Sequence, residues 1–168
     1  TVGELTVLVT RIQNFRVRMK WMIEAAKSLL KDVAEEQNHL LAGPTEEAQR
    51  YMDLARCTEG KQESKIEELE AIATNMKGAV MIIFPQHCSG PEFLKTMTAK
   101  MEAETTDDKT RSTCHRLLSI LDDDATTDDI LTGPTTLWWS GKPLAKEESV
   151  SKYTGKNEKT KIIVKITT

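Results

Sequence analysis

The stretch that decides the predicted fold is LWWSGKPLAKEESVSKYTGKNEKTKIIVKI, residues 137–166. It begins with two adjacent tryptophans, turns at Gly141-Lys142, and closes on an apolar run at residues 162–166. Short runs rich in aromatic and β-branched residues, bounded by glycine and polar residues, are typical of strands. We therefore expect a strand at the tryptophans, a short second strand from Leu144, and a closing strand at the end of the stretch.

Residues upstream of this stretch predict two further strands and a helix. AVMIIFP, residues 79–85, is a continuous apolar run ended by proline, as in a buried strand. FLKTMTAKME, residues 93–102, alternates between two faces and predicts a second strand. Residues 111–122 predict a helix whose apolar positions follow the i, i+3, i+4, i+7 spacing: Cys114, Leu117, Leu118 and Leu121. Strand, strand, helix, strand, short strand, strand is the order of a β-grasp, a mixed sheet packed on one helix.

The beginning of the chain predicts a long helix over residues 1–40. Thr1 and Glu4 have the spacing of a capping box, in which each side chain pairs with the other residue's free amide. Apolar residues recur every three or four positions and form one stripe: Leu5, Leu8, Val9, Ile12, Phe15, Met19, Met22, Ile23, Ala26, Leu30 and Val33. The stripe breaks near Asn14, so one bent helix and two consecutive helices both fit.

Further helices are expected before the strands begin. Gly43-Pro44 is predicted to end the first helix, because proline cannot continue the amide ladder, and Thr45 can cap a short second one. Residues 62–76 predict another helix. The chain is thus predicted to be an α+β protein, with a helical region at 1–76 and a ubiquitin-like β-grasp domain at 77–168.

Composition limits the class of protein. The chain has 168 residues, of which 39% are hydrophobic and 29% charged, and a formal net charge of -3. This charge argues against a nucleic-acid partner, and no apolar run reaches the roughly 18 residues that span a membrane. The odd set of three cysteines suits a reducing compartment such as the cytoplasm. Because the chain starts Thr-Val-Gly, we expect the helical region to be a fragment of a longer N-terminal part.

Two resemblances rest on quoted segments. LWWSGKPL followed by SVSKYTGKNEKTKIIVKI resembles the last third of ubiquitin in residue type and spacing. KGAVMIIFP, LWW and YTGKNEKTKIIVKI, in that order, resemble the Kurly family of cilia- and flagella-associated proteins, and the opening helix is more loosely similar to that family's first helix. The chain departs from the family in its middle, near residues 57–60, where family members usually carry a longer stretch.

The resemblance to the ciliary family implies a function. Such a protein is not an enzyme, needs no cofactor, and is required for cilium motility through assembly of axonemal outer dynein arms. Its partners are other proteins, either dynein arm assembly factors or axonemal dynein and tubulin, and it works in the cytoplasm and the cilium. The alternative is a structural axonemal component bound to doublet microtubules or to a dynein docking site.

The tryptophans are the first candidate for a binding surface. Side chains alternate between the faces of a strand, so Leu137 and Trp139 are expected to pack on the helix at 111–122, with Trp138 on the other face. Alternatively, the N-terminal helices cover that other face and both rings belong to a core. The sequence leaves both possibilities open.

The closing strand supplies the rest of the predicted surface. Its alternation directs Ile162, Val164 and Ile166 inward. The residues predicted to bind a partner are those expected on the outer face or near it: Trp138, Ile163, Lys142, Lys161 and Lys165.

Two other groups of residues contain the side-chain types of metal or catalytic sites. His87-Cys88 and Cys114-His115 contain the ligand types of a zinc site or of a Cys-His nucleophile, but they lack the usual two-to-four-residue ligand spacing. The acidic run at 122–129 lacks the alternating spacing and central glycine of a calcium loop. We therefore predict no metal site and no catalytic residue.

Overall fold

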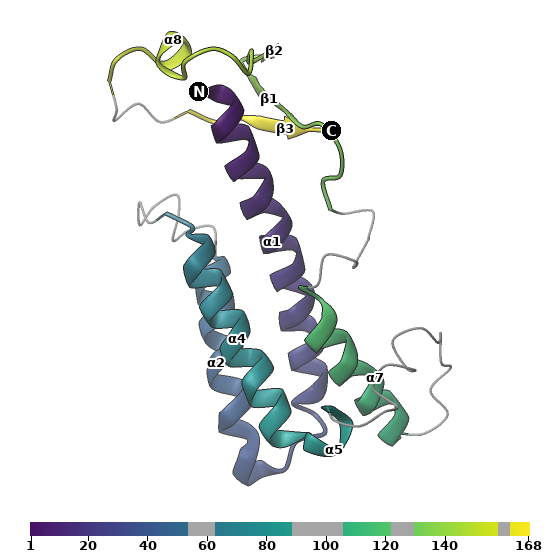
Figure 1. Ribbon diagram of the computed structural model, residues 1–168. Helices are drawn as coiled ribbons and strands as arrows, with labels where there is room; N and C mark the ends of the chain where they lie inside the picture. Colours follow the sequence, from purple (N-terminus) through teal and green to yellow (C-terminus); the bar gives the residue numbers. More distant parts are fainter. Residues whose placement is uncertain (54–62, 89–105, 122–129, 158–161) are drawn as a thin grey trace. The chain divides into compact units, whose positions relative to one another are not determined.

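The computed structural model describes residues 1–53, 63–88, 106–121, 130–157 and 162–168. Over these residues the protein is α+β, with a helix-rich N-terminal part and a small antiparallel sheet near the C-terminus. The elements in chain order are α1 (Val2–Leu29), η1 (Glu35–Gln37), α2 (Asn38–Met52), α4 (Ile66–Ile83), α5 (Pro85–Cys88), α7 (Thr106–Ser119), β1 (Thr136–Trp139), β2 (Lys142–Pro143), α8 (Ser151–Thr154) and β3 (Lys165–Thr167) (Figure 1).

The chain forms two compact units. Unit 1 contains residues 1–14 and 126–168, and unit 2 contains residues 15–125. Helix α1 contributes its first half to unit 1 and its second half to unit 2. The boundary predicted between residues 76 and 77 falls inside helix α4.

Helix α1 begins with the predicted capping box. The Glu4 amide donates to Thr1 Oγ1 at 3.2 Å, and the Thr1 backbone nitrogen donates to Glu4 Oε2 at 2.7 Å. The helix ends at Leu29 and not at residue 40. The chain reverses after it, which allows Leu41 to join the same buried cluster as Leu29.

Unit 2 is a helical bundle in which α2 lies alongside α4 (Figure 1). The prediction that Pro44 ends a helix is wrong, because α2 continues through it. Pro44 cannot donate to the carbonyl of Leu40, and an interior proline costs about 3 kcal/mol. Burial of Leu41 and Ala48 in the bundle core offsets that cost.

The strand predicted at 79–85 is also wrong, because these residues form the end of α4 and the start of α5. The buried positions of α4 keep the helical period throughout: Ile66, Leu69, Ile72, Ala73, Met76, Ala79, Val80 and Ile83. Met81 and Ile82 complete the apolar run but lie on the solvent side, 53% and 66% exposed. A run that is apolar on every side does not distinguish a strand from a helix by periodicity.

The helix predicted at 111–122 is present as α7, beginning five residues earlier. Its predicted core residues Cys114 and Leu117 are buried, but in the cluster of unit 2 with α4 and α5. It is therefore not the helix that packs on Leu137. The strand predicted at 93–102 lies outside the described residues, and the β-grasp is not confirmed.

The sheet of unit 1 has the order β2-β1-β3, with both pairs antiparallel. Strands β1 and β2 are joined by the two-residue loop Ser140-Gly141, whose φ angles are 49° and 77°. Positive φ at both loop positions is the requirement of a type I′ hairpin, whose twist matches that of the strands. The predicted turn is thus present, one residue earlier than Gly141-Lys142.

The first half of α1 covers the inner face of this sheet. Val2, Leu137 and Leu144 form the buried cluster of unit 1, with Leu5, Val9, Trp139, Val150, Tyr153, Val164 and Ile166 packed around it. The first amides of α1 bind the loop after β2, with Val2 N donating to Glu148 O and Gly3 N to Lys146 O, both at 2.9 Å. A Cβ on Gly3 would lie 3.2 Å from that Lys146 oxygen, so only glycine allows this approach without a shift.

Side chains farther along α1 continue the contact within unit 1. The hydroxyl oxygens of Thr10 and Thr135 lie 2.9 Å apart. The Asn14 amide donates to Leu131 O at 3.0 Å and accepts from Leu131 N at 2.9 Å, so it satisfies both backbone groups of that residue. Two residues of α1, one turn apart, are thereby tied to the segment that leads into β1.

Gly78→Ala is expected to raise the free energy of unfolding by about 0.5–1 kcal/mol. Gly78 lies inside α4, and a Cβ built on it meets nothing within 4 Å, so alanine restricts the unfolded chain without a clash. The measurement is urea unfolding followed by circular dichroism. Gly133→Ala is the matched control and should lower stability, because Gly133 has φ +85°. A loss of stability in Gly78→Ala would contradict the helical assignment of residues 78–83.

Candidate functional site

The outer face of the sheet, opposite α1, is the best candidate for a binding surface. Trp138 faces Lys165 on β3 and Pro143 on β2, and Thr136 faces Thr167 in the adjacent row. Residues directly opposite in an antiparallel pair share a face. We call these five residues the Trp138 face.

Trp138 is partly exposed, and its one polar side-chain atom is hydrogen-bonded. The side chain is 36% exposed, and its Nε1 donates to Thr167 Oγ1 at 3.0 Å. This hydrogen bond satisfies the polar atom of the indole, whose other ring atoms are carbon. Tryptophan in such a position is among the residues most enriched at interaction hot spots.

The neighbouring tryptophan has a different environment. Trp139 is half-buried and packs against the cluster of Val2, Leu137 and Leu144. Alternation along β1 therefore separates the two rings as expected, but the helix beneath Leu137 and Trp139 is α1. Lys142 is opposite Trp139 and not Trp138. It lies exposed at the hairpin end, outside the Trp138 face.

The closing segment, residues 161–168, contains the other residues predicted to bind a partner. Ile162, Val164 and Ile166 are half-buried, whereas Ile163 and Lys165 are exposed, as the alternation predicted. Ile163 is 93% exposed. Lys161 lies outside the described residues. The structure thus brings Trp138 and Lys165 together, and a binding role for any of the five predicted residues stays a prediction.

A polar brace that the sequence reading missed closes the loop after β2. The Tyr153 hydroxyl donates to Glu148 Oε2 at 2.6 Å and accepts from the Ala145 amide at 3.0 Å. The Lys152 ammonium pairs with the other oxygen of Glu148. The hydrogen bonds from Lys152 and Tyr153 lower the pKa of the Glu148 carboxyl. The available signal was the four-residue spacing of Glu148 and Lys152, which is that of a helical ion pair.

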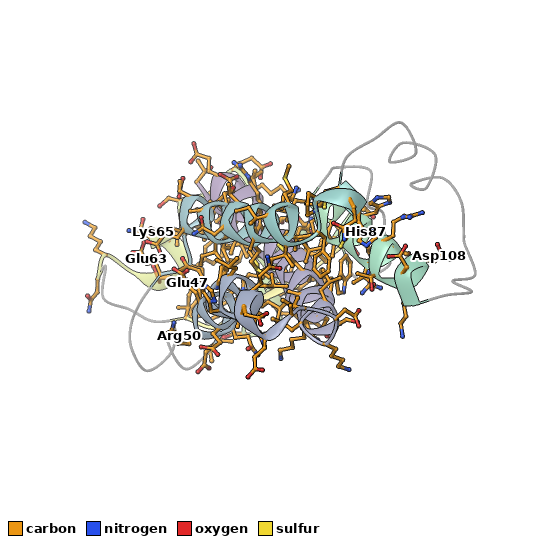
Figure 2. The ribbon with its side chains drawn as sticks, turned by 90° about the horizontal axis from the view of Figure 1, so that it is seen from below. Glu47, Arg50, Glu63, Lys65, His87 and Asp108 are labelled. Carbon is orange, nitrogen blue, oxygen red and sulfur yellow. The ribbon has the colours of Figure 1, made fainter. Side chains whose placement is uncertain are left out.

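The two Cys-His pairs do meet, at the contact of α5 and α7 in unit 2. His115 Nε2 lies 2.6 Å from the His87 carbonyl oxygen, and His87 Nε2 lies 3.3 Å from Asp107 Oδ1. His87 and the first turn of α7, marked by Asp108, lie at the same end of the bundle (Figure 2). The described residues contain no group of three or more His, Cys, Asp or Glu side chains that could hold a metal ion.

The thiols at this contact are poorly suited to nucleophilic chemistry. Burial, followed by the nearby Cys88 thiol, raises the pKa of Cys114 to about 12. Burial also raises the pKa of the Cys88 thiol. The thiolate is the reactive form of cysteine, so both side chains stay protonated and weakly reactive at neutral pH. Their contact joins α5 to α7.

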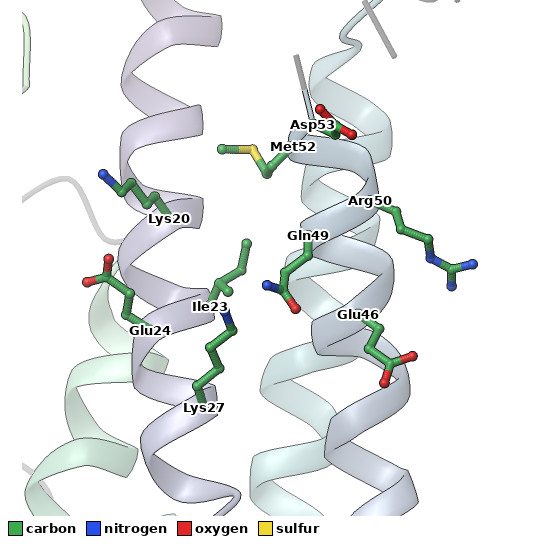
Figure 3. Close-up of a pocket in the computed structure, with 9 residues that line it drawn as sticks. All are labelled: Lys20, Ile23, Glu24, Lys27, Glu46, Gln49, Arg50, Met52 and Asp53. Atoms are coloured by element: carbon green, nitrogen blue, oxygen red, sulfur yellow. The ribbon is translucent and has the colours of Figure 1, made fainter. Parts of the chain in front are cut away.

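A groove of about 710 Å³ lies between α1 and α2 in unit 2 (Figure 3). It is lined by Lys20, Ile23, Glu24, Lys27, Glu46, Gln49, Arg50, Met52 and Asp53. Its charged side chains are of both signs and lie along its two walls (Figure 3). Without a field of one sign or a deep apolar floor, the groove selects no class of ligand.

The comparisons with known proteins point to one group. The family model of cilia- and flagella-associated protein 298 matches residues 135–168. The chain is 30% identical over 124 residues to cilia- and flagella-associated protein 298-B of Xenopus laevis, covering 70% of this chain and 40% of the relative. It is 34% identical over 101 residues to the Danio rerio protein of the same name, covering 60% and 29%. The Homo sapiens protein is 28% identical over 143 residues, covering 85% and 40%.

The chain therefore spans about 40% of the length of the first of these relatives. No solved structure matches it. Among the described residues, no helix is long and apolar enough to cross a membrane. The matches agree with the cilia- and flagella-associated part of the sequence resemblance, and the names that they carry include no enzyme activity.

Trp138→Ala is expected to lower the free energy of unfolding by only about 1–2 kcal/mol, since the ring is partly exposed and leaves no enclosed cavity. Leu137→Ala is the matched control on the same strand. Because Leu137 is fully buried, its truncation should cost about 2–5 kcal/mol. Chemical denaturation of both variants measures the difference. A Trp138→Ala cost of about 3–5 kcal/mol would mark the ring as core and rule out its use as a binding surface.

Cys114 is expected to react with iodoacetamide at pH 7.5 on the order of 100- to 1,000-fold more slowly in the folded protein than in urea. A pKa of about 12 leaves a very small thiolate fraction, and the rate should keep rising with pH above 9. Site-resolved mass spectrometry of timed samples follows the reaction. Equal rates in the folded and unfolded protein would contradict the buried α5–α7 contact.

Proposed function

We propose that this chain is part of a member of the cilia- and flagella-associated protein 298 family. On this proposal it is a non-enzymatic protein that acts by protein–protein interaction in the assembly of axonemal outer dynein arms, and so in cilium motility. The observation that carries the proposal is that the segment matched by the family model contains the candidate binding surface. The family match, residues 135–168, covers all three strands of the sheet and thus the whole Trp138 face.

The physical form of the site supports interaction and not catalysis. The Trp138 face combines an apolar ring whose N–H is already bonded with an exposed ammonium opposite it. Such a surface can take an apolar side chain and an acidic group of a partner. The thiols that might have served as nucleophiles have raised pKa values, which lowers their reactivity.

The finer fold proposed for unit 1 is a ubiquitin-like arrangement built on α1. A sheet with one helix on its inner face is the part of a β-grasp that unit 1 contains, with the first half of α1 taking the place predicted for residues 111–122. The resemblance of residues 137–166 to the last third of ubiquitin supports this arrangement. Partners in this proposal are dynein arm assembly factors, and the sites of action are the cytoplasm and the cilium.

The proposal predicts that tagged protein from motile ciliated cells recovers dynein arm proteins or their assembly factors, and that Trp138→Ala and Lys165→Glu each reduce recovery at least ~10-fold. Ile82→Ala is the matched control, since Ile82 is an exposed apolar residue of unit 2. It should leave recovery unchanged. Each variant is first checked for a cooperative thermal transition, so that lost binding is separated from lost folding.

Extraction of cilia distinguishes the assembly role from the structural alternative. An assembly factor should leave with the soluble ciliary and cytosolic protein. A structural component on doublet microtubules or at a dynein docking site should stay in the salt-resistant axoneme. Retention there, with tubulin as the main protein recovered, would replace the assembly role by the structural one.

A further inference from the structure

We draw no further inference here: the strongest candidate, the surface patch of the exposed apolar residues Met81 and Ile82 near the end of α4 in unit 2, carries none because nothing in the described part of the structure shows what covers it.

Discussion

Burial of Leu137 against the first turns of α1 is the contact on which the small sheet depends. The three strands have four, two and three residues, and so few residues do not form a stable sheet by themselves. Leu137 is fully buried at the centre of the central strand, with Val2 from the helix on one side and Leu144 beyond the hairpin on the other. The Trp138 face therefore exists as a surface because α1 holds the opposite side.

This arrangement explains how much of the fold was predictable. The hairpin, the inward and outward alternation of 162–166 and the capping box depend on neighbours in sequence, and each is present as the local rules state. The helix that covers the sheet depends on a contact between residues more than 130 positions apart. Sequence order favoured residues 111–122 for that role, and nothing local distinguished them from the first turns of α1.

The errors in unit 2 have a related physical cause. Residues 79–84 have a strand-like composition, but they directly follow the helical residues of α4. When the helix continues through residue 83, its buried face is extended without a break. Pro44 is a local helix breaker that tertiary burial overrides. In both cases packing against another helix decided the secondary structure. Local propensity carries no information about that packing.

The candidate site was predictable to a similar degree. Alternation alone placed Trp138 and Lys165 on the outer face but left open whether the N-terminal helices cover Trp138. The position of Lys142 needed the register of the hairpin, which the exact turn residues set. The brace of Glu148, Lys152 and Tyr153 required a tyrosine five residues from its acceptor to fold back, and no sequence rule specifies that. The meeting of the two Cys-His pairs likewise depended on how α5 and α7 pack.

The docking of α1 on the loop after β2 has a consequence for how this protein can vary. The amides of Val2 and Gly3 bind main-chain carbonyl oxygens of residues 146 and 148 and read none of their side chains. Lys146 and Glu147 are exposed, so either can be exchanged freely without disturbing the junction. Position 3 has the opposite character, because a methyl group there would press on the Lys146 oxygen. Sequence divergence in this loop should therefore be wide at positions 146 and 147, and narrow at position 3 of the helix.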